Sequence, residues 1–185
     1  VEISNTSTEY DRIKQLFLQT MKNYKVLKIQ RVQNPSLWKV FQWQKEKMKR
    51  ENGGRDVTEK LLFHGTKTIF MESICLHNFD WRICGNNGTN YGKGSYFARD
   101  ASYSHEYCQP VGKTKTMFVA RVLVGDYVRG NTAYVRPPIK PFNSLQFYDS
   151  CVDNEFNPSV FVIFEKYQVY PEYIIEYKVE EKCVL

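Results

Sequence analysis

The order in which helical and strand patterns follow one another is the feature that most constrains the fold of this chain. Helix-like spacing of apolar residues occurs mostly early, whereas runs rich in β-branched and aromatic side chains fill 116–128, 159–171 and 172–179. Helices and strands that are segregated in this way favour an α+β fold over an alternating parallel fold. The 185 residues suffice for one domain with a sizeable core, and no repeat or low-complexity linker divides them.

The first 60 residues predict a helix, a strand and a second helix. Thr6 or Ser7 can cap the first helix, 24–33 alternates as a strand does, and Asn34 with Pro35 opens the second helix, which ends at 52–54. The positions expected to face inward are Ile13, Leu16, Phe17 and Met21 in the first helix and Leu37, Trp38, Phe41 and Met48 in the second.

The middle of the chain predicts a short strand over 61–66 and a helix over 67–79. Ile69, Phe70, Ile74 and Cys75 are expected on its inner side. After a loop over 80–90, a strand is predicted over 95–98 and a helix over 100–107, with Asp100 as its N-cap. A long loop is predicted from about 130 to 150.

The net charge of +6 belongs entirely to the first 60 residues, which hold 13 Lys and Arg against 7 Asp and Glu. Such a surplus is compatible with a face for nucleic acid or an acidic partner, and equally with a solvated helical face. Lys45, Lys47, Lys49 and Arg50 spread around their helix instead of forming one stripe, which weakens the nucleic-acid interpretation.

The cysteines and the hydropathy pattern bear on the compartment. Five irregularly spaced cysteines favour reduced thiols in a cytoplasmic or nuclear protein. No apolar run approaches the roughly 18 residues of a membrane span. The polar start resembles no signal peptide, and we expect a domain excised from a longer protein.

A cluster of glycines and tyrosines marks a candidate binding site. Gly88, Gly92 and Gly94 let backbone approach a ligand closely, and the surrounding aromatic rings offer flat apolar walls. Ser104 and Tyr107 lie three residues apart, hence on one helical face, where a hydroxyl and a ring can grip a planar amide. The alternative is a tyrosine-rich core strand followed by an ordinary amphipathic helix.

His64 is the sharpest single candidate, because it ends an apolar strand directly before Gly65 and Thr66. There an imidazole and a backbone amide can address one ligand together. The glycines match neither a dinucleotide fingerprint nor a phosphate-binding P-loop. Cys75-x-His77 and His105-x-x-Cys108 lack the spacing of common zinc sites, so no metal is expected.

Several motifs together resemble the catalytic domain of the poly(ADP-ribose) polymerase (PARP) family. They are His64-Gly65-Thr66, the run YGKGSYFA over 91–98 and Ser104-x-x-Tyr107, in that order and from about residue 60 onward. The segments FDWRICG, RVLVGDYVRGN, YDSCVDN and FVIFEKYQVYPEY are most similar to the CCCH-zinc-finger subgroup, that of the zinc-finger antiviral protein.

This resemblance implies an ADP-ribosyltransferase fold, with two small, packed, mainly antiparallel sheets flanked by helices. Residues 1–185 would form one domain, in which 1–60 are a helix-strand-helix lead-in and 61–185 are the NAD-binding core. NAD⁺ would be a co-substrate, with no metal. Protein side chains would be the acceptors, the chain a monomer, and any association with RNA would fall to domains outside this chain.

The resemblance also assigns residues to NAD⁺. His64 would bind the adenosine ribose, the backbone of Gly65 and the Ser104 hydroxyl would hold the nicotinamide carboxamide, and Tyr96 and Tyr107 would sandwich the ring. The full set expected to contact NAD⁺ is His64, Gly65, Thr66, Tyr91, Tyr96, Ala98, Ser104 and Tyr107.

The third catalytic position departs from the polymerising members of the family. In those members the catalytic residues are a histidine, a tyrosine and a glutamate at the start of a late strand. The residues of this chain that match these three positions are His64, Tyr96 and Val160. Glu165 lies five residues on, about 16 Å away at ~3.3 Å per residue, so only another register would bring it there. We therefore expect transfer of single ADP-ribose units. The alternatives are an inactive pseudoenzyme that serves an RNA-binding antiviral protein as an interaction module, and a nucleic-acid-binding domain.

Overall fold

The computed structural model describes residues 1–82 and 88–181. Cys84, Gly85 and Cys183, named in the motifs and the cysteine argument, lie outside this part. The elements in chain order are α1 (Thr8–Leu18), β1 (Tyr24–Arg31), α2 (Pro35–Glu51), β2 (Glu59–His64), η1 (Thr68–Phe70), α3 (Met71–His77), β3 (Ser95–Ala98), α4 (Ala101–His105), β4 (Thr114–Leu123), β5 (Tyr127–Arg129), β6 (Ile139–Lys140), β7 (Asn143–Phe147), β8 (Ser150–Val152), β9 (Val160–Ile163), η2 (Lys166–Gln168) and β10 (Val169–Val179).

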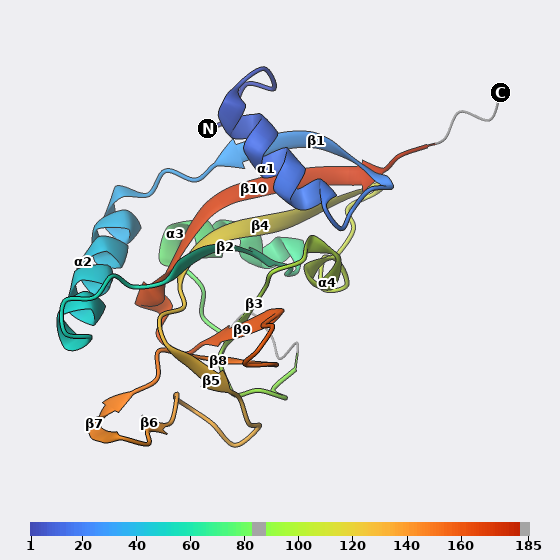
Figure 1. The fold of residues 1–185 in the computed structure, drawn as a ribbon. Helices are drawn as coiled ribbons and strands as arrows, with labels where there is room; N and C mark the ends of the chain where they lie inside the picture. Colours follow the sequence, from blue (N-terminus) through green and yellow to red (C-terminus); the bar gives the residue numbers. More distant parts are fainter. Residues whose placement is uncertain (83–87, 182–185) are drawn as a thin grey trace.

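Most strands belong to one sheet with the order β1-β10-β4-β2-β3-β9-β8-β5, and only its outermost pair, β5 and β8, is parallel. The α+β class and the mainly antiparallel sheet are thus confirmed. The two expected sheets are halves of this one sheet. A single register pair, Phe63 opposite Ala98, joins β2 to β3, and we call this pair the central rung. Figure 1 shows β1, β10, β4 and β2 running together, with β3, β9, β8 and β5 as a second group below them.

Alternation along β4 explains why both faces of the sheet are covered. Met117 and Val119 pack in one apolar cluster with Ile13 and Phe17 of α1. Phe118 and Ala120 point the other way, into a cluster with Ile74 of α3 and Phe79. In Figure 1, α1 lies in front of the upper strands and α3 behind them.

The first two helices begin where the sequence predicts. The Ser7 hydroxyl accepts a hydrogen bond from the Tyr10 amide, and the Asn34 side chain accepts one from Leu37, with Pro35 in the first turn. In the third apolar cluster, Phe41 and Met48 of α2 pack against Leu123 and Tyr170 of the sheet. No helix of the described part is both long and apolar enough to cross a lipid bilayer.

Three local expectations are wrong, and a fourth, the N-cap of α4, is right in position only. Trp38, expected to face inward, is 39% exposed, although its ring packs against Tyr170. Ile69 is 79% exposed, because the segment starts as the short η1 turn and its buried side comes only with Ile74 of α3. Asp100 occupies the N-cap position of α4, but its carboxylate binds the Arg99 guanidinium and not a helix amide. The helix predicted over 100–107 already ends at His105.

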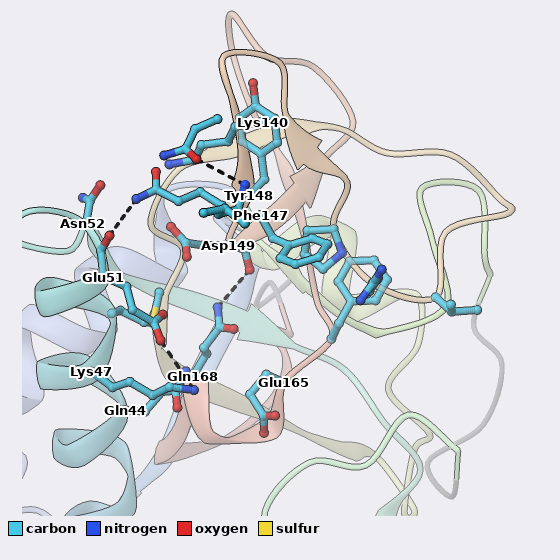
Figure 2. Close-up of a pocket in the computed structure, with 18 residues that line it drawn as sticks. Gln44, Lys47, Glu51, Asn52, Lys140, Phe147, Tyr148, Asp149, Glu165 and Gln168 are labelled. Atoms are coloured by element: carbon cyan, nitrogen blue, oxygen red, sulfur yellow. Dashed lines mark hydrogen bonds and ion pairs between the residues drawn. The ribbon is translucent and has the colours of Figure 1, made fainter.

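The predicted loop from 130 to 150 contains a hairpin, β6–β7, which forms a separate two-stranded sheet. The Gln146 side chain donates to the Glu51 carbonyl at the end of α2. Between this hairpin, α2 and the turn after β9 lies a cavity of about 820 Å³ (Figure 2). Figure 2 shows Lys47 and Glu51 on the α2 side, facing Phe147 and Tyr148 of the hairpin region. Both basic and acidic side chains line this cavity, so its charge favours neither an anionic nor a cationic ligand.

Candidate active site beside the central rung

His64 ends β2 next to the central rung with an unused acceptor atom. Its ring is buried against Phe79 and Phe97. Burial lowers the pKa of His64 to about 4, so the imidazole is neutral at pH 7. Nδ1 lies 2.7 Å from the Tyr96 carbonyl oxygen, which can only accept, so Nδ1 carries the proton. Nε2 therefore keeps its lone pair, and it has no partner within the described residues.

The two residues after His64 are fixed by close approach to α4. A Cβ added to Gly65 would lie 2.0 Å from the Ser104 carbonyl oxygen and 3.1 Å from the Cys108 sulfur, so only glycine fits. The backbone of Gly65 and the buried Ser104 are thereby neighbours. The Thr66 hydroxyl is also buried and, in the part of the chain described, has no hydrogen-bond partner. Buried polar atoms that lack partners suggest a site for a polar ligand.

The Tyr96 side chain closes the segment that precedes β3. Its hydroxyl donates to the Gly92 carbonyl at 2.7 Å and accepts from the Tyr91 amide at 3.0 Å. Burial raises the pKa of Tyr96, which keeps the hydroxyl a donor. Gly92 has a positive φ of 130°, which other residues rarely adopt, and a side chain there would also collide with the Phe164 ring. Tyr91, Gly92 and Tyr96 therefore form one tightly connected turn.

Tyr107 lies just beyond α4 but stays tied to it. Its amide donates to the Ser104 carbonyl at 3.1 Å, which continues the helix by one tight turn. Its ring lies 5.5 Å from the ring of Tyr103, centroid to centroid. Burial is the main cause of the raised pKa of Tyr96, and the nearby Tyr107 phenol adds a smaller contribution in the same direction. The structure thus gathers the tyrosines of β3 and α4 in one neighbourhood.

Val160 lies in line with the central rung. It pairs with Ala98, which itself pairs with Phe63, and two residues further on Val162 pairs with Tyr96. Direct partners share a face of an antiparallel sheet, as do alternate residues of a strand. The side chains of Val160 and Tyr96 therefore project from the same face.

Asp153 holds the start of β9 in place. One carboxylate oxygen accepts from the amides of Ser159 and Val160, both at 3.0 Å, and the other accepts from the Ser159 hydroxyl. Burial alone would raise the pKa of Asp153. These hydrogen bonds, with one from the Asn154 amide, outweigh burial and lower it. The carboxylate is thus ionised and fully engaged.

Glu165 does not take the place of Val160. The register fixes Val160 opposite Ala98, and β9 ends at Ile163. Glu165 instead caps the η2 turn, where its exposed carboxylate accepts from the Tyr167 amide.

A hydrogen-bond network connects α4 to the strands β1 and β10. His105 Nδ1 lies 2.8 Å from the Tyr177 hydroxyl and Nε2 lies 3.2 Å from that of Tyr24, while the Cys108 thiol donates to the Ser104 carbonyl. These contacts engage both nitrogens of His105. Among residues 1–82 and 88–181, no three His, Cys, Asp or Glu side chains gather closely enough to hold a metal.

The sequence-based reasoning missed Asp153, Phe79 and Phe97. Nothing in the spacing of Asp153 and Val160 reveals their contact, although Asp153 lies in one motif segment of the resemblance and Val160 directly precedes another. Phe79 and Phe97 look like ordinary core residues. Their role in fixing His64 follows only from the sheet, which places them against its ring.

Comparison with known sequences identifies relatives along most of the chain. Residues 7–179 match the family described as "Poly(ADP-ribose) polymerase catalytic domain". Human "Protein mono-ADP-ribosyltransferase PARP12" is 57% identical over 182 residues, which cover 98% of this chain and 26% of that protein. Mouse "Protein mono-ADP-ribosyltransferase PARP11" is 43% identical, with 96% of this chain and 60% of that protein covered.

A third relative, human "Protein mono-ADP-ribosyltransferase PARP14", is 39% identical over 96% of this chain and 10% of its own length. The chain thus spans about a quarter of the length of PARP12 and a smaller part of PARP14.

Proposed function

The chain belongs to the poly(ADP-ribose) polymerase catalytic-domain family, and on this premise we propose that it transfers single ADP-ribose units from NAD⁺ to protein side chains and releases nicotinamide. The observation that carries the restriction to single units is the register that puts Val160, and no acid, in line with Ala98 at the start of β9. The names of the relatives, protein mono-ADP-ribosyltransferases, support the same activity.

The residues present fit NAD⁺ as a co-substrate. The unpartnered Nε2 of His64 is an acceptor, which suits a ribose hydroxyl. Next to it, the close approach of Gly65 to α4 brings its backbone together with Ser104, and the Gly65 backbone and the Ser104 hydroxyl would supply the donors and acceptors that a carboxamide needs. Tyr96 and Tyr107 would supply the walls for the nicotinamide ring.

The chemistry then depends mainly on positioning. An acceptor oxygen forms a bond to the anomeric carbon of the nicotinamide ribose, while the bond from that carbon to the ring nitrogen breaks. The ring nitrogen keeps the electron pair, and neutral nicotinamide leaves. An acceptor that is already ionised, such as an acidic side chain, gives up no proton and needs no base. A ribose hydroxyl does need one, and valine cannot act as a base, so chains do not grow.

The alternative is a pseudoenzyme that keeps the fold and transfers nothing. The unpartnered, neutral His64 favours the enzyme, because a core histidine would have both ring nitrogens satisfied. We propose further that residues 1–185 act as one catalytic unit with 1–60 as its lead-in, monomeric and cytoplasmic or nuclear, with RNA contacts left to domains outside this chain.

Labelled NAD⁺ tests the proposed activity and the role of Val160 together. Wild-type protein should give one sharp labelled band on a gel, and Val160→Glu should also give single units. A carboxylate at this buried position loses hydration, so its pKa rises and the domain becomes somewhat less stable. A ladder from the wild type would contradict the assignment of Val160, and no label in any condition would favour the pseudoenzyme.

Tyr107→Ala should weaken the binding of nicotinamide by removing one wall of the ring site. The wild type should gain melting temperature with nicotinamide, because the ligand binds only the folded state. The shift should shrink in Tyr107→Ala, while the melting temperature without ligand changes little, since Tyr107 is only half-buried. Tyr103→Ala removes a neighbouring ring as a control and should keep most of the shift. Equal shifts in wild type and Tyr107→Ala would refute this assignment.

A further inference from the structure

The strands β2 and β3 meet only at the central rung, and away from the proposed NAD⁺ site they diverge. Residues 59–62 of β2 pair with β4 on one edge. Within the described residues, their other edge pairs with no strand. An open strand edge offers backbone N–H and C=O groups to an added strand.

A cavity of about 580 Å³ lies along this open edge. Helix α1 forms one wall, and Leu16 with Leu61 contributes apolar surface. We call this groove the basic notch; it is lined by Arg12, Ile13, Gln15, Leu16, Gln19, Lys60, Leu61, Leu62 and Arg99. An open strand edge along a groove is suited to an extended chain.

The charges of the basic notch have one sign, because Arg12, Lys60 and Arg99 line it and no carboxylate does. Arg99 is neutralised by Asp100 beside it. Arg12 donates to the Tyr173 hydroxyl at 3.3 Å, and the Lys60 ammonium lies 6.0 Å from the centre of the Phe161 ring. In the described part of the chain, neither Arg12 nor Lys60 forms a salt bridge, although Glu9 shares the Tyr173 hydroxyl with Arg12 and lies near enough for the two charges to attract. Both cations can still contact an incoming anion.

The notch borders both faces of the sheet: Lys60 lies on the face of Phe161, and Leu61 on the face that carries Val160. Leu61 and Phe63 alternate along β2 and share a face, and that face continues across the rung through Ala98 to Val160. Helix α1 and the buried Ala101 of α4 pack on this same side. A strand added along 59–62 would therefore end at the central rung, next to Ala98 and its partner Val160.

We propose that the basic notch docks an extended, acidic segment of the protein acceptor as an added strand on β2. The inference rests on the proposed function, since it names the class of acceptor. Backbone hydrogen bonds to β2 give the segment its direction, and Arg12 and Lys60 select glutamate and aspartate side chains. The same preference provides the ionised acceptor that a site without a catalytic acid requires.

Binding of model peptides tests the proposal without NAD⁺. Fluorescence anisotropy would compare a labelled peptide of Glu-Glu-Val-Val repeats, which presents Glu on both faces of a strand, with the corresponding Lys and Val peptide, at low salt. The acidic peptide should bind, and Lys60→Glu or Arg12→Glu should weaken it about tenfold through like-charge repulsion. Lys25→Glu is the matched control, because Lys25 is an exposed lysine on β1, the far edge of the same half-sheet. It should leave binding unchanged.

Backbone methylation separates strand addition from simple charge attraction. In a strand, alternate amides face the partner. Of two acidic peptides methylated on alternate sets of amide nitrogens, one should lose binding and the other should retain it. Equal binding of both, or equal weakening by Lys25→Glu, would overturn the proposal, as would a single-stranded RNA that binds the notch more tightly than the acidic peptide.

Transfer kinetics keep this proposal distinct from the proposed function. With the acidic peptide as acceptor, Lys60→Glu should raise KM for the peptide about tenfold and leave kcat and KM for NAD⁺ unchanged. If no variant transfers ADP-ribose but the peptide still binds as described, only the proposed function fails. If transfer proceeds with the same KM in Lys60→Glu, only the docking proposal fails.

Discussion

Gly65→Ala should lower the free energy of unfolding by about 3 kcal/mol and abolish stabilisation by nicotinamide. The added methyl would lie 2.0 Å from the Ser104 carbonyl oxygen, which belongs to the backbone of α4 and cannot rotate away. Overpacking of this kind typically costs 1–3 kcal/mol, sometimes more. Because α4 must move, Ser104 and Tyr107 move with it, and transfer from NAD⁺ should fall below detection. Chemical denaturation and thermal shift measure the two effects.

Gly112→Ala is the matched control for the loss of a glycine. Gly112 has a positive φ of 62°, and a Cβ there would meet no atom within 4 Å. It should therefore lower stability by about 1–2 kcal/mol, through backbone strain alone, and leave nicotinamide binding intact. A stable Gly65→Ala protein with normal transfer would show that α4 does not depend on this contact.

His64→Asn should reduce kcat/KM for NAD⁺ by two to three orders of magnitude, the roughly 10²–10³-fold effect of losing a positioned hydrogen-bond partner. The Asn amide can still donate to the Tyr96 carbonyl, as Nδ1 does now, but it has no atom at the place of Nε2. His64→Gln is the complementary variant. Its amide oxygen reaches the place of Nε2 and can accept, while the bond to Tyr96 is lost. We expect His64→Gln to be the more active, and the reverse order would show that His64 acts only through Tyr96.

The pKa of His64 gives the same pair of variants a signature in stability. Above about pH 6.5 the imidazole is neutral whether folded or unfolded. As the pH falls from 6.5 to about 4, the unfolded chain takes up a proton that the folded chain refuses, and stability declines. This loss reaches about 3 kcal/mol near pH 4, at 1.36 kcal/mol per unit. Both variants should lack this part of the acid sensitivity, as denaturation at several pH values would show.

Much of the fold follows from local patterns that the packing does not override. The caps at Ser7 and Asn34, and the alternation along β4, depend on neighbouring residues, so the sequence predicts them. The N-cap expectation for Asp100 fails in part because two hydrogen-bond donors compete for one carboxylate. Asp100 has a choice between a helix amide and Arg99, and charge attraction decides it. Arg99 is a sequence neighbour, but its guanidinium also binds Asn157, which only the folded chain brings beside it.

The candidate site is predictable in part for the same reason. The motifs carry His64, Gly65, Ser104 and Tyr107, and the structure brings Gly65 and Ser104 into contact. The way these residues are supported is invisible in the sequence. Asp153 holds the amide of Val160 from a different strand end, and the contact depends on sheet register. The register of β8 and β9 depends on the conformation of the turn over 153–159, and the spacing of residues along either strand does not specify that turn.

The central rung has a mechanical consequence for an enzyme of this kind. His64 and Gly65 continue the strand on one side of it, and Tyr96 and Val160 belong to the strands on the other. The two halves of the proposed site are therefore aligned by one residue pair of the sheet, by the hydrogen bond from His64 to the Tyr96 carbonyl and by the packing of α4. Reaction rates change a hundredfold with displacements near 1 Å, whereas unfolding responds only to the total of all contacts. Small substitutions at Phe63 or Ala98 should therefore shift His64 relative to Tyr96 and Val160. Such a shift should slow turnover while the melting temperature of the domain hardly changes.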